Sequence, residues 1–83
     1  MTIHVRLFAA LREAMGRDFV ELSLDEDATP EDVWQALLGV EGGAALQPRR
    51  TNLAAAVNRK YAKFDATLRD GDEVVFIPPV SGG

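Results

Sequence analysis

The stretch LRDGDEVVFIPPVSGG, residues 68–83, contains a turn, a strand and a stiff tail in that order. Asp70-Gly71 marks a tight turn, because aspartate bonds to nearby backbone and glycine accepts a left-handed conformation. Residues 74–77 follow as a strand, in which Val75 and Ile77 share the side opposite Val74 and Phe76. Pro78-Pro79 ends this strand, since neither proline can donate a hydrogen bond to a ladder.

The stretch ends in Gly82-Gly83, which leaves a carboxylate with no side chain near it. Such a carboxylate can enter a narrow pocket of another protein, where a side chain would collide. If residues 78–83 are extended, they form a stalk reaching roughly 18 Å beyond the last strand. Taken alone, the two glycines are equally compatible with an inert tail.

Working outward, residues 2–8 alternate as a half-buried strand, with Phe8 on the side of His4 and Arg6. Residues 9–15 are good helix formers and Gly16 is a plausible cap, which predicts a short helix. Residues 19–24 predict a second strand, in which the side chain of Phe19 lies on the side opposite that of Val20.

Thr29-Pro30-Glu31-Asp32 is a clear helix start, because threonine caps free amides and proline fits the first turn. This main helix is expected to end near Gly39 or Gly42-Gly43 and to place Trp34 in the core or at its edge. Residues 44–52 suggest a loop, 53–57 a third strand and 61–64 a short fourth strand. The order predicts one α+β domain over residues 1–83: a mixed sheet crossed by one main helix, with a short extra helix after the first strand.

Composition excludes several classes of function. The chain has 83 residues and a net charge of −4, with no long basic run, so nucleic acid is not an expected partner. No apolar run approaches the roughly 20 residues that span a bilayer, and a cytoplasmic protein is expected. With no cysteine and one histidine, the chain has no thiolate nucleophile and no metal or cofactor site of that kind. We therefore expect partner enzymes to act on it.

Four segments together resemble a known family: VRLFAALRE (5–13), LAAAVN (53–58), LRDGDEV (68–74) and FIPPVSGG (76–83). The chain resembles the small subunit of molybdopterin synthase, in the MoaD/ThiS family of ubiquitin-like sulfur carriers. The likeness covers the whole chain, weakly over residues 17–52 and strongly from residue 53 onward.

The resemblance implies a β-grasp (ubiquitin-like) fold and a sulfur carrier whose working residues are Gly82 and Gly83. It implies that an ATP-dependent activating enzyme adenylates Gly83, that a sulfurtransferase supplies sulfur, and that a thiocarboxylate results. The tail then enters the large subunit of a heterotetramer and donates sulfur to cyclic pyranopterin monophosphate, which makes molybdopterin. The chain itself binds no cofactor in this scheme, because ATP is bound by the activating enzyme.

The resemblance also implies a docking patch made of Phe8, Tyr61 and Ile77, with the tail residues Pro78, Pro79, Val80 and Ser81 entering the partner. The alternation of residues 2–8 supports the inclusion of Phe8, because Phe8 is a large apolar residue on the side of the strand where a polar one is expected. The alternative is that one or more of these residues packs in the core.

Three other functions fit parts of the pattern. A sulfur carrier for the thiazole of thiamine shares the fold and the activation, but that family lacks the ending Phe-x-Pro-Pro-Val-x-Gly-Gly. A ubiquitin-like modifier would join Gly83 to lysines of other proteins. An interaction domain with an inert tail would lose no activity if Gly83 were removed.

Overall fold

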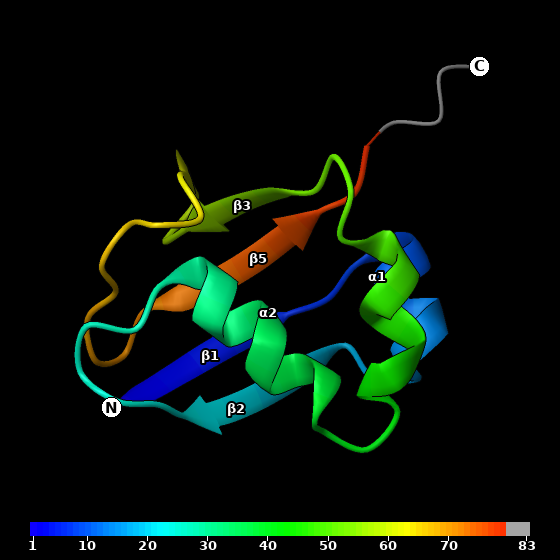
Figure 1. Ribbon diagram of the computed structural model, residues 1–83, viewed down its shortest axis with the longest axis horizontal. Coiled ribbons are helices and arrows are strands. Elements are labelled where there is room, and N and C mark those ends of the chain that lie inside the picture. The colour runs from blue at the N-terminus through cyan, green and yellow to red at the C-terminus, as the bar shows by residue number, and fades with distance from the viewer. Residues whose placement is uncertain (80–83) are drawn as a thin grey trace.

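The computed structural model describes residues 1–79, and the order of elements along the chain is the predicted one with one addition. The elements are β1 (Thr2–Arg6), α1 (Ala9–Met15), β2 (Phe19–Ser23), α2 (Pro30–Leu38), the 3₁₀ helix η1 (Gly43–Arg49), β3 (Ala54–Val57), β4 (Lys60–Ala62) and β5 (Glu73–Ile77). Figure 1 shows α2 crossing the sheet. The α+β fold with one main helix and a short helix after the first strand is confirmed.

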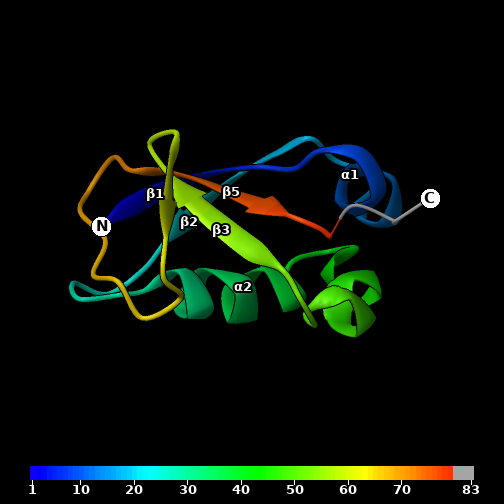
Figure 2. The ribbon, with the colours of Figure 1, turned by 90° about the horizontal axis from the view of Figure 1, so that it is seen from above.

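The five strands form one mixed sheet in the order β2-β1-β5-β3-β4. The central pair, β1 and β5, is parallel, and the other three pairs are antiparallel. Figure 2 shows α2 and η1 on one face, and no helix of residues 1–79 covers the middle of the other face. We call the helix-covered side the inner face and the other side the outer face.

The inner face and α2 enclose the core. Val5, Val74 and Phe76 point inward from the central strands and have no exposed surface. Trp34 is 1% exposed, and its ring and that of Phe76 are nearly perpendicular, at 80°, with centroids 5.2 Å apart. This edge-to-face contact is a favourable aromatic geometry. The prediction that Trp34 lies in the core or at its edge is confirmed.

Capping residues mark both ends of α2 and the C-terminal end of α1. Thr29 accepts a hydrogen bond from the Asp32 amide and the Asp32 carboxylate accepts one from the Thr29 amide, which completes a capping box. Pro30 occupies the first turn and Gly39 caps the other end. Gly16 caps α1 in a left-handed conformation, with φ of 78°.

The loop predicted for residues 44–52 is wrong over most of its length, since η1 occupies residues 43–49. Leu46 anchors η1 in the core with no exposed surface. Gly43 lies so close to α2 that a β-carbon there would sit 1.8 Å from the Leu37 carbonyl oxygen. A single buried leucine gives no periodic pattern, so the helix was not visible in the sequence.

Two strands end two residues earlier than expected, and every other strand bound lies within one residue of its expected place. The first strand stops at Arg6, so Phe8 lies just beyond it and forms the N-cap of α1 with an extended backbone. The fourth strand covers Lys60–Ala62 rather than 61–64. Neither shift moves a predicted docking residue to the other face of the sheet.

Candidate functional site

The predicted tail starts at the end of the central strand β5, which stops at Ile77. Pro78 is half-buried and Pro79 is exposed. An open hollow of about 470 Å³ adjoins the two prolines and is lined by the start of α1 and the end of η1. Val80, Ser81, Gly82 and Gly83 lie outside the described residues, so their predicted roles stay predictions.

Strand register brings a row of residues together across the outer face. Each member lies directly opposite the next on the neighbouring strand. In sheet order the row is Phe19, Arg6, Val75, Ala56 and Tyr61. Opposed residues on one face have β-carbons about 5 Å apart, so their side chains touch or nearly touch. The row therefore crosses the full width of the sheet.

The predicted patch residues lie on this face. Ala54 opposes Ile77 in the next row toward the tail, and Phe8 lies two residues past Arg6 on the same side of the chain. Phe8 is 51% exposed and Tyr61 is 81% exposed, while Ile77 is half-buried. None of the three belongs to the buried core, so the alternative in which one of them packs there is wrong.

Phe19 is a third exposed aromatic residue, with 40% of its surface accessible, and the predicted patch omitted it. Its outward parity was already visible in the alternation of residues 19–24. What the sequence did not reveal is its neighbourhood, because the register that places it opposite Arg6 depends on pairing between separate strands.

The outer face becomes polar with distance from the tail. The next row holds Glu21, His4 and Glu73 at opposed positions. The Arg6 guanidinium binds the Glu73 carboxylate at 3.0 Å, and His4 Nδ1 lies 3.6 Å from the Glu21 carboxylate. The apolar part of the face therefore lies toward the start of the tail, where a docked partner would also meet Pro78-Pro79.

A separate polar cluster ties α2 to the segment that follows η1. The Arg50 guanidinium donates two hydrogen bonds to the Glu31 carboxylate, at 2.6 and 3.1 Å, and lies 3.8 Å from the centre of the Phe64 ring. Hydrogen bonding by Arg50 holds the pKa of Glu31 below its usual range, against a smaller opposing effect of burial. This cluster faces away from the outer row and supports the fold.

Residues 1–79 contain neither a metal-binding cluster nor a membrane-spanning helix. No three histidine or carboxylate side chains gather there in a way that could hold a metal ion. No helix within the same range has the length and apolar character needed to cross a membrane. The candidate site is the outer face, which is apolar near Pro78-Pro79 and polar farther from them.

Comparison with known proteins gives a consistent relationship. The ThiS family model matches residues 5–83. The molybdopterin synthase sulfur carrier subunit of Escherichia coli is 42% identical over 81 residues, which cover 98% of this chain and 99% of that protein.

Two further matches come from Haloferax volcanii. Small archaeal modifier protein 1 is 34% identical over 86 residues, covering 94% of this chain and 97% of that protein. The crystal structure of SAMP1 from the same organism superposes with a TM-score of 0.88 at 32% identity, and all of each chain is covered.

Proposed function

Since this chain belongs to the ThiS family, we propose that it is the sulfur carrier subunit of a molybdopterin synthase. Gly83 is the carrier residue in this proposal: its carboxyl is adenylated, converted to a thiocarboxylate and used to donate sulfur to cyclic pyranopterin monophosphate. The observation that carries the proposal is the apolar outer face, which lies beside the start of the tail. The 42% identity of the chain to the Escherichia coli carrier subunit supports the same function.

The chemistry requires that the carboxylate be activated. A terminal carboxyl has an ordinary pKa of about 3.5, so at neutral pH it is an anion and a poor electrophile. In adenylation a carboxylate oxygen attacks the α-phosphorus of ATP and pyrophosphate leaves. Sulfur at the oxidation level of sulfide then attacks the acyl carbon, AMP leaves, and the thiocarboxylate results. In this proposal partner enzymes supply the nucleotide pocket, the ATP and the sulfur source. The chain has no cysteine that could carry the sulfur itself.

The chain contributes position in this scheme. Phe8, Tyr61 and Ile77 dock on the large subunit and, in turn, on the activating enzyme. Pro78-Pro79 fixes the direction in which the tail leaves β5, which lowers the entropy lost when the tail enters a pocket. The glycines then pass the narrowest part. In this proposal the carrier and its ATP-dependent partner work together in the cytoplasm.

The intact mass of the protein isolated from its own cells tests the proposal, with a Gly83-deleted variant as control. A gain equal to the sulfur-for-oxygen difference, absent from the control, is expected. An unchanged mass after incubation with ATP, the activating enzyme and a sulfurtransferase would overturn the carrier function. The same mass shows whether Gly83 is the terminal residue in the cell.

A second candidate is a protein modifier whose Gly83 forms amide bonds with lysines. The similarity to the Haloferax modifier protein, in sequence and in structure, favours it specifically. Conjugates of high molecular weight that survive a denaturing gel, and that vanish when Gly83 is deleted, would establish this activity. A thiazole carrier is distinguished by restored thiamine synthesis rather than restored molybdopterin synthesis in a strain lacking this gene.

A further inference from the structure

The outer face carries more apolar surface than the predicted patch contains. Phe19 opposes Arg6, and Phe8 lies two residues beyond Arg6 with an extended backbone. The bond from the Leu7 amide to the Asp18 carbonyl, 2.9 Å long, continues the pairing past the end of β1. The two phenylalanines are therefore diagonal neighbours on one face, within reach of each other.

Phe19 is held in place on this face. Its ring stacks on that of His4, with centroids 6.0 Å apart and an interplanar angle of 26°. A ring fixed before binding loses little conformational freedom on binding. A single exposed phenylalanine needs no explanation. Phe19 differs because it lies at one end of the outer row, opposite Arg6, and is a diagonal neighbour of Phe8. Val75 and Ala56 continue the row from Arg6 to Tyr61 at its other end.

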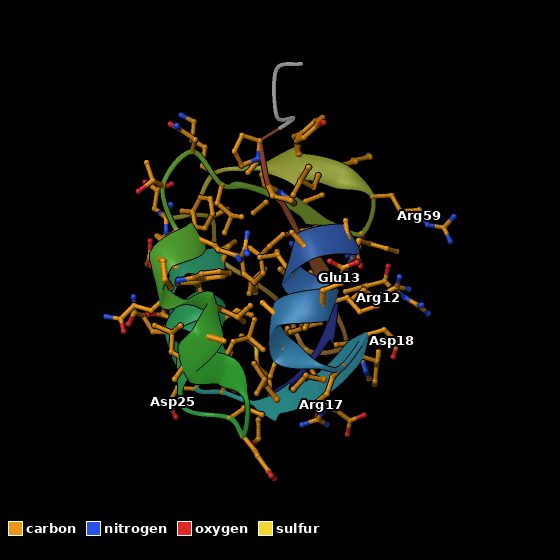
Figure 3. The ribbon with its side chains drawn as sticks, turned by 90° about the vertical axis from the view of Figure 1, so that its right-hand side faces the viewer. Arg12, Glu13, Arg17, Asp18, Asp25 and Arg59 are labelled. Atoms are coloured by element: carbon orange, nitrogen blue, oxygen red, sulfur yellow. The ribbon has the colours of Figure 1, made fainter. Side chains whose placement is uncertain are left out.

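Charge is distributed unevenly around this face. Figure 3 shows Arg12, Arg17 and Arg59 on the side away from α2 and η1, with Glu13 and Asp18 beside them, while Asp25 lies on the other side. Within residues 1–79 none of these three arginines has a carboxylate at ion-pair distance, since the arginine pairs there involve Arg6 and Arg50.

Most carboxylates lie elsewhere. Two segments hold them, residues 25–32 and 65–72, and a 2.9 Å bond from the Leu68 amide to the Ala28 carbonyl joins the two. Figure 1 places both segments at the end of the molecule opposite the described end of the chain. They are Asp25, Glu26, Asp27, Glu31, Asp32, Asp65, Asp70 and Asp72, out of 13 acidic residues in all. The chain as a whole has a net charge of −4. The arginines near the outer row therefore have the sign opposite to that of the whole chain.

We propose that Phe19 is a further anchor of the docking surface and that Arg17 and Arg59 select the partner by charge. The occupant is the large subunit of the proposed function, on which this inference rests. Its matching surface must have an apolar centre, to cover Phe8, Phe19 and Tyr61, and carboxylates around that centre. Arginines at the edge of such a surface act mainly on association and its salt dependence.

The test measures binding of the purified large subunit from the same organism to the full chain and its variants, by titration calorimetry. Phe19→Ser lowers the affinity about tenfold, and Phe19→Leu, which keeps the apolar area, restores most of it. Arg59→Glu lowers the affinity about fivefold at low salt, and the effect shrinks at high salt because ions screen exposed charges. The matched control, Arg69→Glu, is an exposed charge reversal in the opposite acidic segment and changes affinity less than twofold.

Phe8→Ser is measured alongside, so that two kinds of failure are distinguished. If Phe8→Ser weakens binding but Phe19→Ser does not, the wider surface is wrong and the proposed function stands. If the unaltered chain does not bind the large subunit, both are overturned. Thermal unfolding of each variant, unchanged within a few degrees, shows that losses of affinity are not losses of fold.

Discussion

The inner and outer faces of the sheet follow the same alternation of side chains but end in different environments. On β5, Val74 and Phe76 are completely buried under α2, whereas Val75 and Ile77 remain half-exposed on the other side. The outer face is nevertheless apolar near the tail, and it carries the exposed rings of Phe8, Phe19 and Tyr61. Alternation thus decides which residues share a face, and the position of α2 decides which face becomes the core. Changes on the inner face should therefore cost stability, and changes on the outer face should cost binding.

The largest effect on stability is expected from Trp34→Ala. The substitution removes a 1% exposed ring that packs in a T-shaped pair with Phe76. Truncating a buried tryptophan costs about 3–5 kcal/mol of unfolding free energy, and a small domain has only about 5–15 kcal/mol in total. Chemical denaturation measures the loss. Gln35→Ala, the neighbouring exposed position on α2, should stay within about 0.5 kcal/mol. Equal losses in the two variants would contradict the assignment of the core.

The next effect concerns how tightly η1 packs on α2. In Gly43→Ala the new methyl group would lie 1.8 Å from the Leu37 carbonyl oxygen, so one backbone segment must move. Overpacking of this kind costs about 1–3 kcal/mol. Gly39→Ala is the matched control, because its methyl group would meet its nearest atom at 3.5 Å in an ordinary helical conformation. A Gly43→Ala variant as stable as the Gly39→Ala variant would show that η1 is not held in this position.

These two sites also show what the sequence predicts and what it does not. The strands and α2 follow from alternation and from capping residues such as Thr29, because both are local patterns. The helix η1 has no such pattern: it is held by Leu46 and by close approach of Gly43 to α2, which are tertiary contacts. The docking patch was predicted by family resemblance as Phe8, Tyr61 and Ile77. Phe19 was missed because its place beside them depends on strand register.

A smaller effect, and one that depends on pH, is expected at Glu31. Arg50 lowers the pKa of Glu31, so the folded state favours the ionised carboxylate. The pair therefore adds stability above the ordinary glutamate pKa of about 4.3, and that contribution is lost as the pH falls through the lower folded pKa. Both side chains are more than a third exposed, so Glu31→Gln should cost about 0.5–1 kcal/mol at pH 7. The difference from the unaltered protein should vanish in acid.

Denaturation at several pH values between 2 and 7 measures this difference. Glu41→Gln is the control, because Glu41 is exposed and makes no ion pair within residues 1–79. A Glu31→Gln penalty that stays constant down to pH 2 would mean that the charge of Glu31 contributes nothing and that the amide simply packs less well.

The smallest effect on stability, and the sharpest contrast between the faces, is expected at Tyr61. Its ring is 81% exposed, so Tyr61→Ser removes almost no buried surface and should change the unfolding free energy by less than about 0.5 kcal/mol. The same ring is a predicted docking residue, and loss of an interface anchor costs more than about 1 kcal/mol of binding free energy. Titration of the large subunit should therefore show roughly a fivefold or greater loss of affinity in a protein that unfolds at the normal temperature.

Lys63→Ser, an exposed change just beyond the same strand, should leave the unfolding free energy and the affinity for the large subunit unchanged. If Tyr61→Ser instead unfolded the protein and left binding intact, the outer face would be part of the fold, and the division between the two faces would be wrong.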